Sequence, residues 1–131
     1  MKVDGPKYSV ILATYDEAQN IGALIDTVSQ ILAHRSFEIV VVDDNSPDGT
    51  WRIAEDRVKT NSSVRVIRRT NERGLTSALN RGIRESKGKW VAWLDCDFQH
   101  PPEKLEELFQ VIDQGYNAVV GSRFLGEGSD L

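Results

Sequence analysis

The 131-residue sequence has a single cysteine, Cys96, and lacks any long apolar run. One cysteine excludes an internal disulfide, which suits a reducing compartment. No run approaches the roughly 20 apolar residues of a membrane span, and the N-terminus does not resemble a signal peptide. A basic excess is also missing, because the net charge is −4. This argues against a general nucleic-acid-binding protein. We therefore expect one cytoplasmic globular domain spanning residues 1–131, with any membrane association peripheral.

Five short apolar runs alternate with segments whose apolar residues recur at helical spacing. Apolar runs without strict alternation fit strands covered on both faces, as in a parallel sheet. The predicted strands are Tyr8–Ala13, Phe37–Val42, Val64–Arg69, Trp90–Leu94 and Ala118–Gly121, and the predicted helices are Ile21–Ala33, Thr50–Val58, Leu75–Ile83 and Glu103–Ile112. This order predicts an α/β fold with an open, doubly wound, mostly parallel, Rossmann-like sheet and helices on both faces. Ligands of such sheets bind at the carboxyl ends of the strands.

Polar residues follow every predicted strand. Asp43 and Asp44 stand at the end of the second strand, before a segment rich in turn-forming residues. Turn formation explains the downstream residues well, but it explains two adjacent acids at a strand end less well. A carboxylate at this position could accept hydrogen bonds from the N–H groups of a base or from ribose hydroxyls.

Asp95, Asp97 and Gln99 follow the fourth strand at alternating positions. If the extended conformation continues past Leu94, their side chains lie on one side. Two carboxylates and an amide oxygen suit Mg²⁺ or Mn²⁺, and zinc is disfavoured because the one thiol of the sequence, on Cys96, would point the other way. The alternative is a solvated acidic loop that precedes a helix, since an Asp-x-Asp pattern alone is a weak signal.

Three further features at the strand ends are candidates for ligand contacts. Arg123 follows the fifth predicted strand and could meet a diphosphate, or it is an ordinary surface arginine. Arg73 and Gly74 precede a helix N-terminus, which attracts anions, or they form a polar loop. Tyr15 could stack on a base or simply pack.

The segments TYDEAQNI, VVVDDNSPDGTW, GLTSALNRGI, LDCDFQHPPEKL and GSRF resemble, in order and spacing, the family 2 glycosyltransferases. The similarity is greatest to the dolichyl- or polyprenyl-phosphate mannosyltransferase group. The resemblance implies a GT-A fold and metal-dependent transfer of a sugar, with inversion, from a nucleotide diphosphate to a polyprenyl phosphate. It favours GDP-mannose over a UDP-sugar as donor, and mannose over glucose as the sugar.

The resemblance also implies roles for individual residues. It implies catalytic roles for Asp95, Asp97 and Arg123, and it implies Asp95, Asp97 and Gln99 as metal ligands. It implies nucleotide contacts for Ala13, Tyr15, Glu17, Asp43, Asp44, Asp95, Cys96 and Asp97. The family often has proline in place of Ala13 and alanine in place of Cys96, so at Cys96 we expect a backbone contact. The family domain usually continues beyond the GSR strand, so we expect this chain to lack the acceptor-side region.

Other classes share parts of this pattern. The acidic pocket of a response-regulator receiver domain uses acids after the first strand, a phospho-acceptor after the third and a lysine after the fifth, whereas here the acid pairs follow the second and fourth strands and Arg123 follows the fifth. A nucleotidyltransferase usually has a Gly-rich, basic loop after the first strand, where this chain has the acidic TYDEAQN. A non-catalytic nucleotide-binding module and a glycosyltransferase with a saccharide hydroxyl acceptor both remain alternatives.

Overall fold

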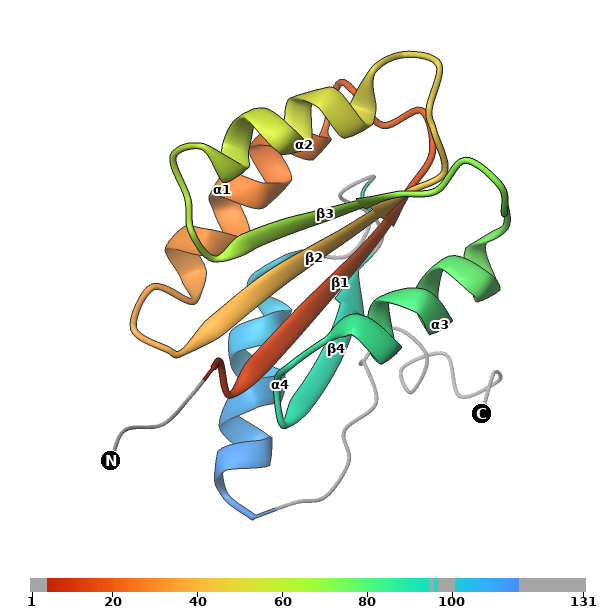
Figure 1. Cartoon of the computed structure of the whole chain (residues 1–131). Coiled ribbons are helices and arrows are strands. Elements are labelled where there is room, and N and C mark those ends of the chain that lie inside the picture. The colour runs from red at the N-terminus through yellow and green to blue at the C-terminus, as the bar shows by residue number, and fades with distance from the viewer. Residues whose placement is uncertain (1–4, 95, 97–100, 116–131) are drawn as a thin grey trace.

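A computed structural model describes residues 5–94, 96 and 101–115 of the chain. Within these residues, strands and helices alternate regularly along the sequence (Figure 1). The strands are β1 (Tyr8–Thr14), β2 (Phe37–Asp43), β3 (Val64–Arg68) and β4 (Trp90–Leu94), and the helices are α1 (Ile21–Ile31), α2 (Thr50–Val58), α3 (Leu75–Glu85) and α4 (Lys104–Asp113).

The four described strands form one parallel sheet in the order β3-β2-β1-β4. The chain adds β2 and β3 on one side of β1 and then crosses to add β4 on the other side. This reversal makes the carboxyl end of β1 the switch point at which ligands of doubly wound sheets bind. The register there aligns Thr14 of β1 with Asp43 of β2, and Asp43 with Arg68 of β3.

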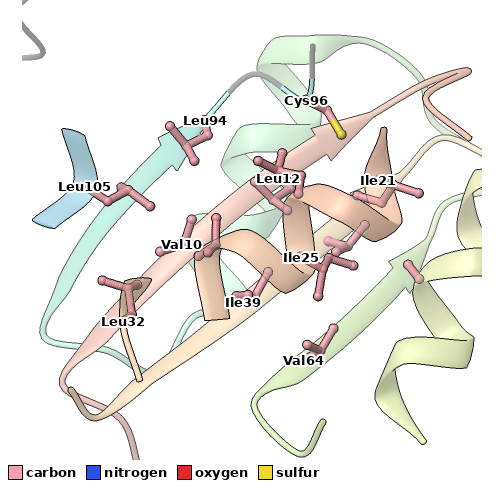
Figure 2. Close-up of a cluster of buried hydrophobic side chains, with 14 of the residues drawn as sticks. Val10, Leu12, Ile21, Ile25, Leu32, Ile39, Val64, Leu94, Cys96 and Leu105 are labelled. Atoms are coloured by element: carbon pink, nitrogen blue, oxygen red, sulfur yellow. The ribbon is translucent and has the colours of Figure 1, made fainter. Parts of the chain in front are cut away.

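Apolar side chains cover both faces of the sheet. On one face, side chains of β1 and β2 pack with those of α1, α2 and α4, and Figure 2 shows part of this cluster. On the other face, α3 packs against β1 and β2, with Ala78 buried against Ile11, Val40 and Val42. Burial on both faces explains why the central strands β1 and β2 are nearly continuous apolar runs rather than alternating ones.

The predicted elements agree closely with the described ones. β4 and α2 have the predicted bounds, and the other described elements differ by one or two residues at an end. The prediction of α/β architecture with helices on both faces is confirmed. The fifth predicted strand, Ala118–Gly121, lies outside the described residues. None of the helices in the described ranges is long and apolar enough to cross a membrane.

Candidate functional site

A cavity of about 240 Å³ opens at the carboxyl edge of the sheet, where β1 and β2 end and α3 begins. Its walls combine small residues, two exposed apolar side chains and two charged groups. Tyr15 is 42% exposed and Leu75 is 61% exposed, although both are large apolar side chains. The lining residues are Ala13, Thr14, Tyr15, Asp44, Arg73, Gly74, Leu75 and Ala78.

The buried carboxylate of Asp44 is fixed in this cavity by groups that follow β3. Arg69 donates to it twice, from Nε to Oδ1 at 2.7 Å and from Nη2 to Oδ2 at 3.0 Å. The backbone N–H of Gly74 donates to Oδ2 at 2.9 Å. A carboxylate has about four acceptor positions, so three are used and one remains for a ligand.

The guanidinium of Arg69 is itself buried and held on several sides. Its side chain is 3% exposed, and it also donates to the Ser77 hydroxyl at 2.9 Å and to the Gly74 carbonyl at 3.1 Å. Its hydrogen bonds to Asp44 raise the pKa of Arg69 above its usual value, although burial opposes the shift. The buried guanidinium is tolerated because each of these partners is a hydrogen-bond acceptor.

Asp43, the neighbouring acid, is fully buried and holds the loop between β2 and α2. Its Oδ1 accepts from the hydroxyls of Thr14 at 2.6 Å and Ser46 at 2.7 Å, and its Oδ2 accepts from the Ser46 N–H at 2.8 Å. These bonds join the ends of β1 and β2. The geometry thus gives Asp43 a supporting role, while a direct ligand contact by Asp43 remains a prediction.

The loop between β1 and α1 is tied to the loop between β2 and α2 by three consecutive backbone donors. The N–H groups of residues 16, 17 and 18 donate to Ser46 Oγ at 2.9 Å, Thr50 Oγ1 at 2.9 Å and Asp48 Oδ2 at 3.1 Å. The turn-forming residues of the second loop therefore also determine the path of the first. Tyr15 gains a defined position beside Asp44 from these contacts.

Several of the predicted nucleotide-binding residues come together in the structure. Ala13, Tyr15 and Asp44 line the cavity with Arg73 and Gly74. Glu17 and Asp43 lie in the adjoining strand end and loop and do not line the cavity. The side chain of Cys96 is buried in the apolar cluster beside α1, as Figure 2 shows, so a contact with a ligand would have to come from its backbone.

The predicted metal ligands Asp95, Asp97 and Gln99 lie outside the described residues, as does Arg123. They follow β4 in the sequence, and β4 ends at Leu94, which pairs in register with Leu12 of β1. Among the described residues, no group of three or more histidine, cysteine or acidic side chains could hold a metal ion. The metal site therefore stays a prediction.

Arg69 was not predicted as a site residue, because it follows an apolar run and reads as the end of a strand. Ser46, in the turn-forming segment after Asp44, and Thr50, the first residue of the predicted helix Thr50–Val58, were likewise not predicted as site residues. The sequence signal that could have identified Arg69 is the unexplained acid pair itself. A buried carboxylate requires a cationic or multiple-donor partner, and Arg69 follows the strand beside β2.

The described sheet is that of a doubly wound α/β domain with a cavity at its carboxyl edge, and comparison with known proteins gives its family. The sequence matches glycosyl transferase family 2 over residues 9–131. The chain therefore belongs to this family. It is 43% identical over 122 residues to a dolichol-phosphate mannosyltransferase from Pyrococcus furiosus, covering 93% of this chain. The match spans only 34% of that relative's length.

Solved structures agree with this assignment. A mannosyltransferase from Pyrobaculum calidifontis, in complex with GDP-Man and Mn²⁺, is 31% identical with a TM-score of 0.64, covering 72% of this chain and 28% of that one. Glucosyl-3-phosphoglycerate synthase from Mycobacterium tuberculosis, in complex with Mn²⁺ and UDP-glucose, is 26% identical with a TM-score of 0.68, covering 85% and 40%. The predicted GT-A fold is confirmed.

Proposed function

We propose that this chain binds the nucleotide of a sugar donor, with the base in the cavity between Tyr15 and Asp44. The observation that carries this proposal is the buried Asp44 carboxylate, which lines the cavity and is held by Arg69 and Gly74 with one acceptor position unused. A base N–H group can donate to that position, while the ring of Tyr15 offers a stacking surface. Small walls at Ala13 and Ala78 leave room for a planar ring.

The reaction that this binding serves is transfer of a sugar, mannose before glucose, to a polyprenyl phosphate. A phosphate oxygen of the acceptor attacks the anomeric carbon from the face opposite the diphosphate, whose bond to that carbon breaks, so the configuration inverts. An acceptor phosphate is ionised near neutral pH and needs no strong general base. The names of the similar mannosyltransferases support this choice of donor and acceptor. Because such an acceptor lies in a membrane, we place the protein at a cytoplasmic membrane face.

The predicted oxygen donors of Asp95, Asp97 and Gln99 suit Mg²⁺ or Mn²⁺. When bound there, the ion would neutralise the charge that develops on the leaving diphosphate, and Arg123 would assist. Asp44 and Tyr15 hold the base on the side of β1 where β2 pairs. The predicted metal ligands follow β4, which pairs on the other side of β1. The nucleotide would therefore lie across the carboxyl end of β1.

Calorimetric titration of GDP and UDP, with and without Mn²⁺, tests the proposal. Asp44→Asn should weaken nucleotide binding about tenfold or more in both conditions, since hydrogen bonds to charged groups contribute about 1.5–3 kcal/mol. Asp97→Ala should remove only the part of the affinity that depends on Mn²⁺. Unchanged binding in both variants would contradict the proposed site.

A second candidate is a nucleotide-binding module without transfer activity, because the chain spans between 34% and 48% of the length of three similar dolichol-phosphate mannosyltransferases. Incubation with GDP-mannose, Mn²⁺ and a polyprenyl phosphate separates the two candidates. Formation of a mannosylated lipid supports the enzyme, and nucleotide binding without any product supports the module. A parallel incubation with a saccharide in place of the polyprenyl phosphate tests the alternative acceptor, which product formed only there would identify.

A further inference from the structure

The guanidinium of Arg73 lies over the ring of Tyr15, 4.9 Å from its centroid, at the mouth of the cavity. Both side chains are exposed. In the described part of the chain, no carboxylate or other acceptor binds the Arg73 guanidinium, whereas its neighbours Arg68 and Arg69 bind Asn45 and Asp44. A cation that is attracted to an aromatic face and is otherwise without a partner is free to move when a ligand enters.

The backbone around Arg73 is fixed, so only its side chain can adjust. The Ser77 hydroxyl donates to the Arg73 carbonyl at 3.3 Å, and the Gly74 N–H donates to Asp44. Gly74 has a φ of 115°, a conformation that favours glycine. The guanidinium is therefore held within side-chain reach of both Tyr15 and the cavity.

The surroundings of Arg73 fit a base better than a phosphate. Asp44 lines the same cavity, and its carboxylate offers only acceptor positions, so it can bind a base N–H group but not the oxygens of an ionised diphosphate. The remaining walls are apolar or small, and the two exposed apolar side chains, Tyr15 and Leu75, suit a planar ring.

We infer that Arg73 covers the outer face of the donor's base and so helps to select and position it, an inference that rests on the proposed function. A ring between Tyr15 and Arg73 needs two stacking contacts of about 3.5 Å each, or about 7 Å in all. The guanidinium must therefore move outward from its 4.9 Å contact as the base enters. This differs from an anion-binding role at the α3 N-terminus, which would direct Arg73 toward the diphosphate.

Affinities of GDP, GMP and pyrophosphate, each measured with Mn²⁺, distinguish the two roles. Arg73→Ala should weaken GDP and GMP by the same factor, about fivefold for a cation–π contact, and leave pyrophosphate unchanged. Arg84→Ala is the matched control, because it removes the same charge from an exposed position on α3 that does not line the cavity. Urea unfolding of both variants should give wild-type stability.

Two results would overturn the inference while leaving the proposed function intact. One is an Arg73→Ala variant that binds GDP with the affinity of the wild-type chain. The other is a loss that grows from GMP to GDP and extends to pyrophosphate, which would place Arg73 on the phosphates. Failure of the wild-type chain to bind either nucleotide would refute the proposed function, and this inference with it.

Discussion

Replacing Arg69 with methionine should destabilise the fold far more than an ordinary arginine substitution. Methionine keeps much of the side-chain length but removes both hydrogen bonds to Asp44, leaving a carboxylate that is 8% exposed with Gly74 as its remaining donor. Removing one partner of a buried ion pair costs about 3–5 kcal/mol, because the other charge stays buried. Arg84→Met, at an exposed position of α3, should change stability by less than about 0.5 kcal/mol.

A double-mutant cycle with Asp44→Asn makes this reasoning quantitative. Each single variant leaves one buried charge without its partner, whereas the double variant leaves neither charge. The double variant should therefore be at least as stable as the less stable of the two single variants. Its loss of unfolding free energy should be well below the sum of the two single losses. The free energy of unfolding from urea titration at neutral pH measures each corner of the cycle. A loss below about 1 kcal/mol for Arg69→Met, or strictly additive losses, would refute the account of this pair.

Two further predictions concern the core and the acid stability of the fold. Gly82→Ala should cost about 1–3 kcal/mol, because the new methyl group would lie 2.5 Å from Ile11 Cγ2 in the core. At Gly22 the close contact is with the flexible end of the Arg57 side chain and the contact with Ile53 is an ordinary one, so Gly22→Ala should be nearly neutral. Hydrogen bonds from Arg35 lower the pKa of Glu106 below its usual value of 4.5, so this stabilisation should be complete above that pH and be lost as the pH falls below it toward the lowered pKa; Arg35→Met should reduce that dependence. Urea titrations from pH 7 to pH 3 test both predictions. Equal losses of stability in the two glycine variants would contradict the first. A pH dependence of stability that Arg35→Met leaves unchanged would contradict the second.

The fold was largely predictable from the sequence, because β1 and β2 are buried apolar runs, β3 and β4 are short and rich in apolar residues, and each helix carries one apolar stripe. Helices cover both sides of the sheet at Tyr8–Thr14, so nearly every residue of this strand is buried. The resulting apolar run is what predicts a strand there. The strand order follows less directly, since the sequence does not show on which side of β1 the fourth strand pairs.

The candidate site was predictable only in part. The positions of Tyr15 and Asp44 follow from the rule that polar residues at strand ends meet at one edge of the sheet. The different roles of Asp43 and Asp44 do not follow, because two adjacent carboxylates look alike until their partners are known. Thr14 and Ser46 occupy acceptor positions of Asp43, while Arg69 leaves one acceptor position of Asp44 open.

The most direct test of the central claim is a titration of isotopically labelled chain with GDP and Mg²⁺, monitored by the backbone amide signals of its NMR spectrum. If the base enters the cavity at the carboxyl edge of the sheet, the largest shifts should fall on Tyr15, Asp44 and Gly74. A second cavity, lined by Glu38, Arg65 and other residues at the opposite ends of the strands, is the internal control, and the amide signals of its residues should not shift. Shifts confined to that second cavity, or no shifts at all, would contradict the account.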